Sequence, residues 1–147
     1  MNKDITATIK HWWPPVAWMS LIFLFSSNLF SDANTSSFLR PLLSSLFPAM
    51  TADQIETIHL TLRKLGHWGE YFILAILCVR ALHAHAPRQS QLRRTASAIA
   101  IATLYAASDE WHQYFVPSRS ASIVDVLIDC FGAVCGSIWF ERRQRGG

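Results

Sequence analysis

The chain has 147 residues, of which 51% are hydrophobic and only 16% charged, and its formal net charge at pH 7 is +3. Soluble domains usually carry about 25% charged residues, so this composition argues against a disordered chain and against a water-soluble globule. The length suits a single domain, residues 1–147. A nucleic-acid partner is not expected, because the basic residues lie between apolar runs instead of forming a stripe on one face.

Four apolar segments have about the 20 residues that a helix needs to cross roughly 30 Å of hydrocarbon. They are residues 12–30, 64–82, 95–116 and 122–140. The first carries no charge, the fourth carries only Asp125 and Asp129, and the other two have a polar section at one end. A cleaved signal peptide is the competing interpretation of the first segment. It is disfavoured because no clear small-x-small site follows Phe25. The predicted fold is an all-α membrane protein with four transmembrane helices.

The first connection, residues 31–63, is too long for a simple turn and shows helical patterning. Apolar residues recur at helical spacing between Leu39 and Phe47, and again between Ile55 and Leu65 after a possible capping box at Thr51 and Gln54. We therefore expect short interfacial helices here, which either pack against the bundle or cover a site.

The distribution of positive charge predicts the orientation in the membrane, since cytoplasmic loops carry an excess of Lys and Arg. With four spans, the N-terminus, the connection between the second and third spans, and the C-terminus share one side. Nine of the thirteen basic residues lie there: Lys3, Lys10, Arg80, Arg88, Arg93, Arg94, Arg142, Arg143 and Arg145. Both termini of this multi-pass protein are thus expected to be cytoplasmic.

Ionisable residues inside the spans are the informative ones, because each costs roughly 2.5–3.5 kcal/mol at the membrane centre on insertion scales. In the second span, Lys64, His67 and Tyr71 fall on one helical face, with Glu70 to its side. Ionisable residues at such positions need an interaction partner or a functional role.

The third span ends in a second polar group. Asp109, His112 and Gln113 share a face, Glu110 lies about a quarter-turn away, and Ser108 precedes them. The second span begins on the outer side of the membrane and the third span ends on that same side, so both polar groups are expected at the outer face.

The fourth span places Asp125, Asp129, Gly132 and Gly136 on one narrow stripe. The pattern Gly132-x-x-x-Gly136 allows a neighbouring helix to approach that stripe closely. Arg119 lies in the preceding turn. Together the three spans predict a half-buried polar site that opens outward.

Several of these residues also have purely structural interpretations. Ser122 and Asp125 can form a capping box, Ser108 can cap a new helical turn, and Lys64 can extend to the interface. His67 can be a hydrogen-bonded structural histidine, and His112 can face the headgroups. The remaining histidines are predicted to be solvated in or near loops: His11, His59, His83 and His85.

Two blocks of this sequence resemble the VanZ-like family of bacterial membrane proteins, named for a member associated with teicoplanin resistance. The blocks are Lys64-x-x-His67-x-x-Glu70-Tyr71, and Ser108-Asp109-Glu110-x-x-Gln113 followed by Pro117-x-Arg119, Asp125, Gly132 and Gly136. Ser26-Ser27-Asn28 is similar to the family's Ser-Ser-Gln. The resemblance implies a small helical protein of the bacterial inner membrane and cell envelope, with some members changing glycopeptide sensitivity.

Asp129 departs from the family pattern, which usually has Asn at this position. Either burial beside Asp125 keeps the Asp129 carboxyl neutral, or it is ionised with Arg119 or Lys64 as its counter-ion.

The leading hypothesis is that the outer polar site recognises or modifies a headgroup of a membrane lipid or a lipid-linked cell-wall intermediate. Arg119 and Lys64 would hold phosphate. Carboxylates would supply an acid, a base or a metal ligand, and a divalent metal on carboxylates and His67 is conceivable. No nucleophile is evident, so the question of an enzyme stays open.

Two other classes of function remain. A small transporter or flippase is disfavoured because the inner halves of the spans carry no ionisable residue in Leu74–Val79, Ala96–Thr103 and Phe131–Phe140. A structural or regulatory partner, or a homo-oligomer, would use the glycine stripe between chains.

Overall fold

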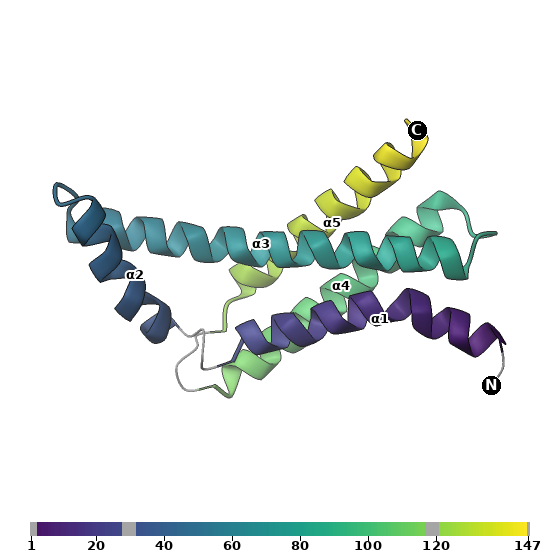
Figure 1. The fold of residues 1–147 in the computed structure, drawn as a ribbon, viewed down its shortest axis with the longest axis horizontal. Coiled ribbons are helices and arrows are strands. Elements are labelled where there is room, and N and C mark those ends of the chain that lie inside the picture. Colours follow the sequence, from purple (N-terminus) through teal and green to yellow (C-terminus); the bar gives the residue numbers. More distant parts are fainter. Residues whose placement is uncertain (1–2, 28–31, 117–120, 147) are drawn as a thin grey trace.

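The computed structural model describes residues 3–27, 32–116 and 121–146. These residues form five helices and no strand: α1 (Lys3–Phe25), α2 (Asp32–Leu46), α3 (Ala52–His85), α4 (Gln91–Tyr114) and α5 (Ile123–Arg145). The prediction of an all-α fold is confirmed over this part of the chain. Figure 1 shows both termini and the α3–α4 connection at the same end of the molecule.

α3 is longer than predicted. The capping box at its start is confirmed: the Thr51 hydroxyl accepts from the Gln54 backbone, and the Gln54 side chain accepts from the Thr51 backbone. The prediction of a separate interfacial helix after Thr51 is wrong, because this segment continues into the second predicted span as one helix of 34 residues. No proline interrupts it. At a rise of 1.5 Å per residue it is about 51 Å long, well beyond the roughly 30 Å hydrocarbon core.

The other helices pack around α3, which contacts α1, α2, α4 and α5, while α4 also contacts α5. The core between them is built mainly from small and medium side chains such as Leu74, Cys78, Ala102 and Ala133, with the large Tyr71 fully buried among them. Small residues let the helix backbones approach closely. The polar residues of α3, α4 and α5 are thereby brought within reach of one another.

The closest approach is between α5 and α3. A Cβ built on Gly132 would lie 2.3 Å from the Trp68 carbonyl oxygen, and one on Gly136 would lie 2.2 Å from that of Phe72. No larger residue fits at either position with this helix spacing. The glycine stripe thus faces α3 of the same chain, and it fixes how α5 is rotated against α3.

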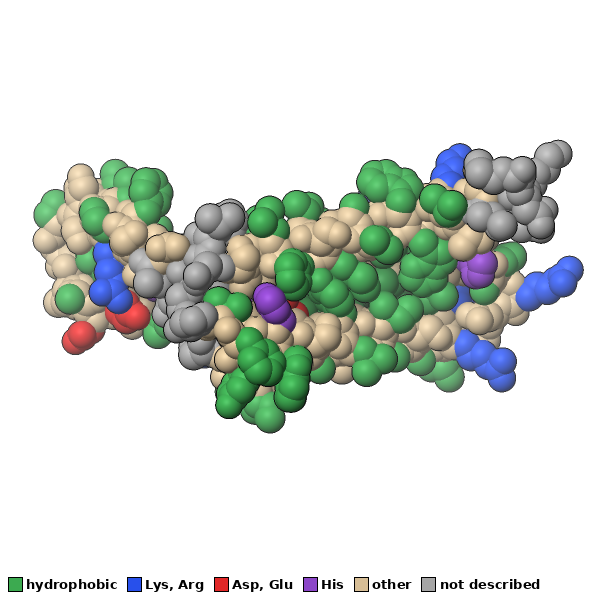
Figure 2. All heavy atoms as spheres, turned by 90° about the horizontal axis from the view of Figure 1, so that it is seen from below, with side chains coloured by type: hydrophobic (Ala, Val, Ile, Leu, Met, Phe, Trp, Pro, Cys, Tyr) green, Lys and Arg blue, Asp and Glu red, His purple; other side chains and the backbone are tan. Residues whose placement is uncertain are grey.

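Two of the described helices, α3 and α5, are long and apolar enough to cross a membrane. α1 and α4 do not meet the same requirement over their described residues, because α1 contains Trp12, Trp13 and two prolines and α4 is polar at both ends. Many large hydrophobic side chains point outward, among them Leu104 and Phe131, which are 72% and 63% exposed. Figure 2 shows many hydrophobic side chains along the middle, several Lys and Arg side chains at the right-hand end, and further basic side chains beside acidic ones at the left-hand end. Such an apolar exterior suits a lipid environment.

Candidate functional site

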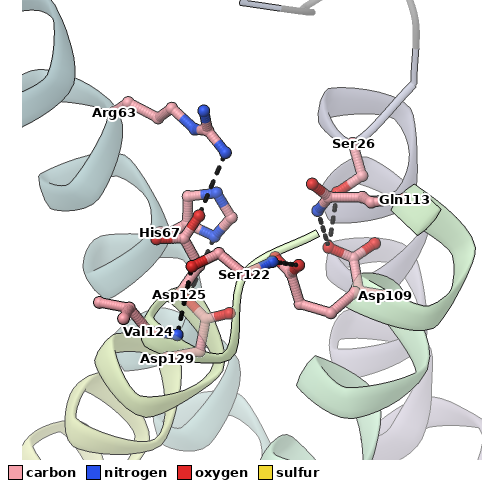
Figure 3. Close-up of polar contacts among 10 residues, drawn as sticks. Ser26, Arg63, His67, Asp109, Gln113, Ser122, Val124, Asp125 and Asp129 are labelled. Carbon is pink, nitrogen blue, oxygen red and sulfur yellow. Dashed lines mark hydrogen bonds and ion pairs between the residues drawn. The ribbon is translucent and has the colours of Figure 1, made fainter. Parts of the chain in front are cut away.

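A polar cluster lies where α3, α4 and α5 meet beside the end of α1. Figure 3 shows its two halves, with Arg63, His67, Asp125 and Asp129 on one side and Ser26, Asp109 and Gln113 on the other. The backbone of Ser122, just before α5, joins them by donating to the Glu110 carboxylate at 2.7 Å. Four segments far apart in the sequence therefore build one site.

The centre of the cluster consists of His67, Glu110 and Asp129. His67 Nδ1 and Asp129 Oδ1 lie 3.3 Å apart. One ligand atom from each of the three residues lies within 4.8 Å of the others. The three side chains come from α3, α4 and α5, and their residues are only 7%, 6% and 1% exposed.

Asp109 lies in the half of the site that adjoins α1. Its Oδ2 accepts hydrogen bonds from the Ser26 hydroxyl at 2.6 Å and from the Gln113 amide at 3.0 Å. Asp109 and Gln113 are one helical turn apart on α4, so the same face presents both. These bonds anchor the end of α1 to α4 through neutral donors.

Arg63 forms the ion pair on the opposite side, with its guanidinium 3.1 Å from the Asp125 carboxylate. The predicted capping box at residues 122–125 is present only in part. The Ser122 hydroxyl accepts from the Val124 backbone at 3.2 Å, whereas the side chain of Asp125 is directed to Arg63.

A cleft of about 320 Å³ opens next to this cluster. Its apolar lining residues are Phe25, Leu39 and Leu62. Its polar lining residues are Ser26, Thr35, His59, Arg63, His67 and Glu70. The lining therefore combines apolar and polar side chains, α2 contributes Thr35 and Leu39 to it, and His67 belongs both to the cleft and to the cluster.

The structure brings together most of the residues singled out in the sequence. His67, Asp109, Glu110, Gln113, Asp125 and Asp129 lie in the cluster. Tyr71 is fully buried in the core below it. Glu70 lines the cleft, and its backbone carbonyl accepts from the Trp18 indole at 2.8 Å.

Other predicted site residues lie elsewhere. Lys64 is exposed at the edge of the cluster, where it lines a smaller hollow together with Arg63, Ser122 and Asp125. Ser108 lies within α4, away from the ends of the helix, and its side chain is exposed. Its hydroxyl donates to the Tyr105 carbonyl, so Ser108 neither joins the cluster nor caps a new turn. His112 packs against Phe23, with ring centroids 4.6 Å apart. Arg119 lies outside the described residues, as do Pro117 and Asn28.

Two histidines were assigned wrongly. His59 was expected to be solvated, but it is only 3% exposed in α3 and lines the cleft. His59 lines the cleft because α3 is continuous, so that residues 59, 63 and 67 lie one turn apart on the same face of the helix. His83 was also expected to be solvated, but its Nε2 lies 3.0 Å from the buried Glu141 carboxylate.

Sequence reasoning also missed Arg63 as a site residue, although it stands next to the chosen Lys64. The pattern of residues 59, 63 and 67 at intervals of four was the available signal. Ser26 was noted only for its resemblance to a family motif, and Ser122 only as a cap.

The site holds an excess of carboxylates among the described residues. The cluster contains four carboxylates, Asp109, Glu110, Asp125 and Asp129, but one arginine, Arg63, and one histidine, His67. Buried charges require partners, so this arrangement is suited to holding a cation or protons. A serine nucleophile is not evident among the described residues of the site, because the Ser26 hydroxyl donates a hydrogen bond to Asp109 and forms none with a histidine.

A family model described as VanZ/LLP1 matches residues 12–142, which is most of the chain. The matched range includes every helix that contributes to the polar cluster. The comparisons with curated proteins and with solved structures gave no match.

Proposed function

The chain belongs to the VanZ/LLP1 family, and from this premise we propose that its cleft binds the phosphate-bearing headgroup of a membrane lipid or lipid-linked cell-wall intermediate. Family membership and the two apolar helices α3 and α5 indicate a membrane protein. The observation that carries the proposal is the mixed lining of the cleft, which combines apolar side chains with an arginine and two histidines. An amphipathic molecule such as a lipid can contact both kinds of side chain.

Arg63 supplies the phosphate-binding group in this proposal. A guanidinium presents several donors in a planar fork that matches phosphate oxygens. Arg63 lines the cleft and is already paired with Asp125. An incoming phosphate would share the guanidinium with Asp125, and the imidazoles of His59 and His67 would add donors from the next turns of α3.

The proposed orientation follows from the charge distribution. Nine of the thirteen Lys and Arg residues lie in or beside the termini and the α3–α4 connection, which share one end of the molecule (Figure 1). The positive-inside rule therefore favours a cytoplasmic position for that end. The cluster lies toward the other end of α3, α4 and α5, which would put the cleft at the outer leaflet. The VanZ-like family is named for a member associated with teicoplanin resistance, so binding of a lipid headgroup there offers a route to altered glycopeptide sensitivity.

A transport path receives less support. Among the described residues, one group of buried polar contacts lies around His67 and another around His83 and Glu141. These histidines are 16 residues apart on α3, or about 24 Å along the helix. Tyr71, Leu74 and Cys78 fill the core between them. The structure therefore favours binding at one face over passage through the bundle.

The experiment that tests the proposal measures lipid binding to the full chain in nanodiscs of defined composition. Native mass spectrometry would score retention of phosphatidylglycerol and undecaprenyl phosphate against phosphate-free diacylglycerol. Arg63→Gln should reduce the preference for phosphate about tenfold, the loss expected when one charged hydrogen bond is removed.

Arg40→Gln is the matched control, because Arg40 also pairs with a carboxylate, Glu56, but is exposed and does not line the cleft. It should retain the preference of the wild-type chain. If Arg63→Gln keeps the same preference for phosphate, or the wild-type chain shows none, the proposal is wrong.

A further inference from the structure

The three buried side chains at the centre of the cluster lack the partners that buried polar groups require. Neither carboxylate oxygen of Asp129 has a hydrogen-bond partner among the described residues, and neither has Glu110 Oε1. His67 Nδ1 is close to Asp129 Oδ1, yet the two atoms are not aligned for a hydrogen bond. Leaving a buried polar group unsatisfied costs about 1–3 kcal/mol, and more if it is charged. Several such groups pointing at one another indicate a missing ligand.

The charges around these groups do not supply that ligand. Arg63 is directed to Asp125 at 3.1 Å. Asp109 is satisfied by the neutral donors of Ser26 and Gln113. The carboxylates of Glu110 and Asp129 therefore share one histidine and one backbone N–H. A small cation between them would neutralise both.

We propose that His67, Glu110 and Asp129 bind a divalent transition-metal cation, of which Zn²⁺ and Mn²⁺ are the best candidates. Carboxylate and imidazole ligands together suit these ions, whereas Mg²⁺ and Ca²⁺ prefer oxygen alone. With metal–ligand distances near 2.1 Å, neighbouring ligand atoms in tetrahedral or octahedral sites lie about 3.0–3.4 Å apart. The His67–Asp129 pair already has this spacing, at 3.3 Å. The remaining ligand atoms lie within 4.8 Å, so closure needs shifts of the order of 1 Å.

The surroundings also fit a metal centre. The Ser122 backbone donates to Glu110 Oε2 at 2.7 Å, which leaves Oε1 available and holds the carboxylate in place. Hydrogen bonds of this kind orient metal ligands in proteins. Three protein ligands leave coordination positions open, and His67 also lines the cleft. A phosphate oxygen could occupy an open position; this step, unlike ion binding itself, rests on the proposed function.

The test begins with ion binding by the wild-type chain without added lipid. The purified protein is stripped with EDTA, dialysed against Zn²⁺ or Mn²⁺, and its retained metal is measured by inductively coupled plasma mass spectrometry. One ion per chain is expected. Electron spin-echo spectroscopy of the Mn²⁺ form should show one coordinated imidazole nitrogen. A spectrum without histidine, or retention far below one ion, would overturn the proposal.

Variants then locate the ion. Asp129→Asn and His67→Gln preserve side-chain size and should weaken binding by about 100-fold or more, since loss even of a supporting group typically costs 10–100-fold. His83→Gln is the matched control. His83 also faces a buried carboxylate across α3 and α5, that of Glu141 at 3.0 Å, but Arg94 lies 3.9 Å from the same oxygen. The His83→Gln variant should bind the ion as the wild-type chain does.

If all variants retain the ion equally, an adventitious ion only has bound and the proposal fails. Failure of the metal site and failure of headgroup binding can be told apart. A chain that retains no metal but loses its phosphate preference in Arg63→Gln contradicts only the metal proposal. A chain that binds metal at His67 but ignores phosphate contradicts only the proposed function.

Discussion

Replacing Gly136 by alanine tests whether the close contact between α5 and α3 holds the site together. The added Cβ would lie 2.2 Å from the Phe72 carbonyl oxygen and 3.0 Å from its carbonyl carbon. Carbon atoms do not approach a carbonyl oxygen within about 3.0 Å. Phe72 O belongs to the helix backbone and cannot rotate away, so α5 and α3 must separate by at least about 0.8 Å.

The cost of that separation can be bounded from the structure. Overpacking of a well-packed core usually costs 1–3 kcal/mol, and the helix pair α3–α5 carries both the Arg63–Asp125 ion pair and the His67–Asp129 contact. Changing an exposed helical glycine to alanine raises the free energy of unfolding by about 0.5–1 kcal/mol. We therefore expect Gly136→Ala to lower the free energy of unfolding by about 1–3 kcal/mol in spite of its better helix propensity.

The assay is equilibrium unfolding in mixed micelles, followed by circular dichroism while the fraction of denaturing detergent is raised. Gly69→Ala is the matched control, because a Cβ at this position meets nothing within 4 Å. It should leave stability unchanged or raise it by up to about 1 kcal/mol. If Gly136→Ala proves no less stable than Gly69→Ala, the helix contact described here is not the one present in solution.

Two other predictions concern hydrogen bonds at the site. Asp125→Asn removes the charge facing Arg63 and should lower the free energy of unfolding by about 1.5–3 kcal/mol. In the Asp125→Asn, Arg63→Gln double variant, the total loss should be smaller than the sum of the losses in the two single variants. A loss equal to that sum would contradict the ion pair. Ser26→Ala removes a 2.6 Å bond to the buried Asp109 and should lower the thermal midpoint more than Ser20→Ala, whose hydroxyl donates within its own helix; equal midpoints would show that Asp109 does not anchor α1.

Local features of the sequence predicted the helices well. Hydropathy and the capping signal at Thr51 depend on residues close together in the chain, and the corresponding α3 start was found as predicted. The boundaries were less accurate. The sequence divided α3 into an interfacial helix and a span because its composition changes near Lys64, but the helix continues since neither Gly66 nor Gly69 is sufficient to end it.

Most of the polar residues chosen from the sequence lie together in the structure. They could be chosen without coordinates, because a buried charge is improbable unless it has a partner or a functional role. The expected cations were Arg119, which lies outside the described residues, and Lys64. Arg63, about 100° from Lys64 around the same helix, is the residue that pairs with Asp125. Both residues are basic, so composition could not separate them.

What the sequence by itself determined is an all-helical membrane protein with titratable side chains near one end of its helices, because hydrophobic length and periodicity are properties of each segment alone. Only the tertiary structure decided which side chains meet. The contacts of Gly132 and Gly136 with the backbone of α3 set the rotation of α5, and this rotation directs Asp129 to His67 and Asp125 to Arg63. Such pairings depend on how helices distant in sequence pack together, and no single segment encodes that.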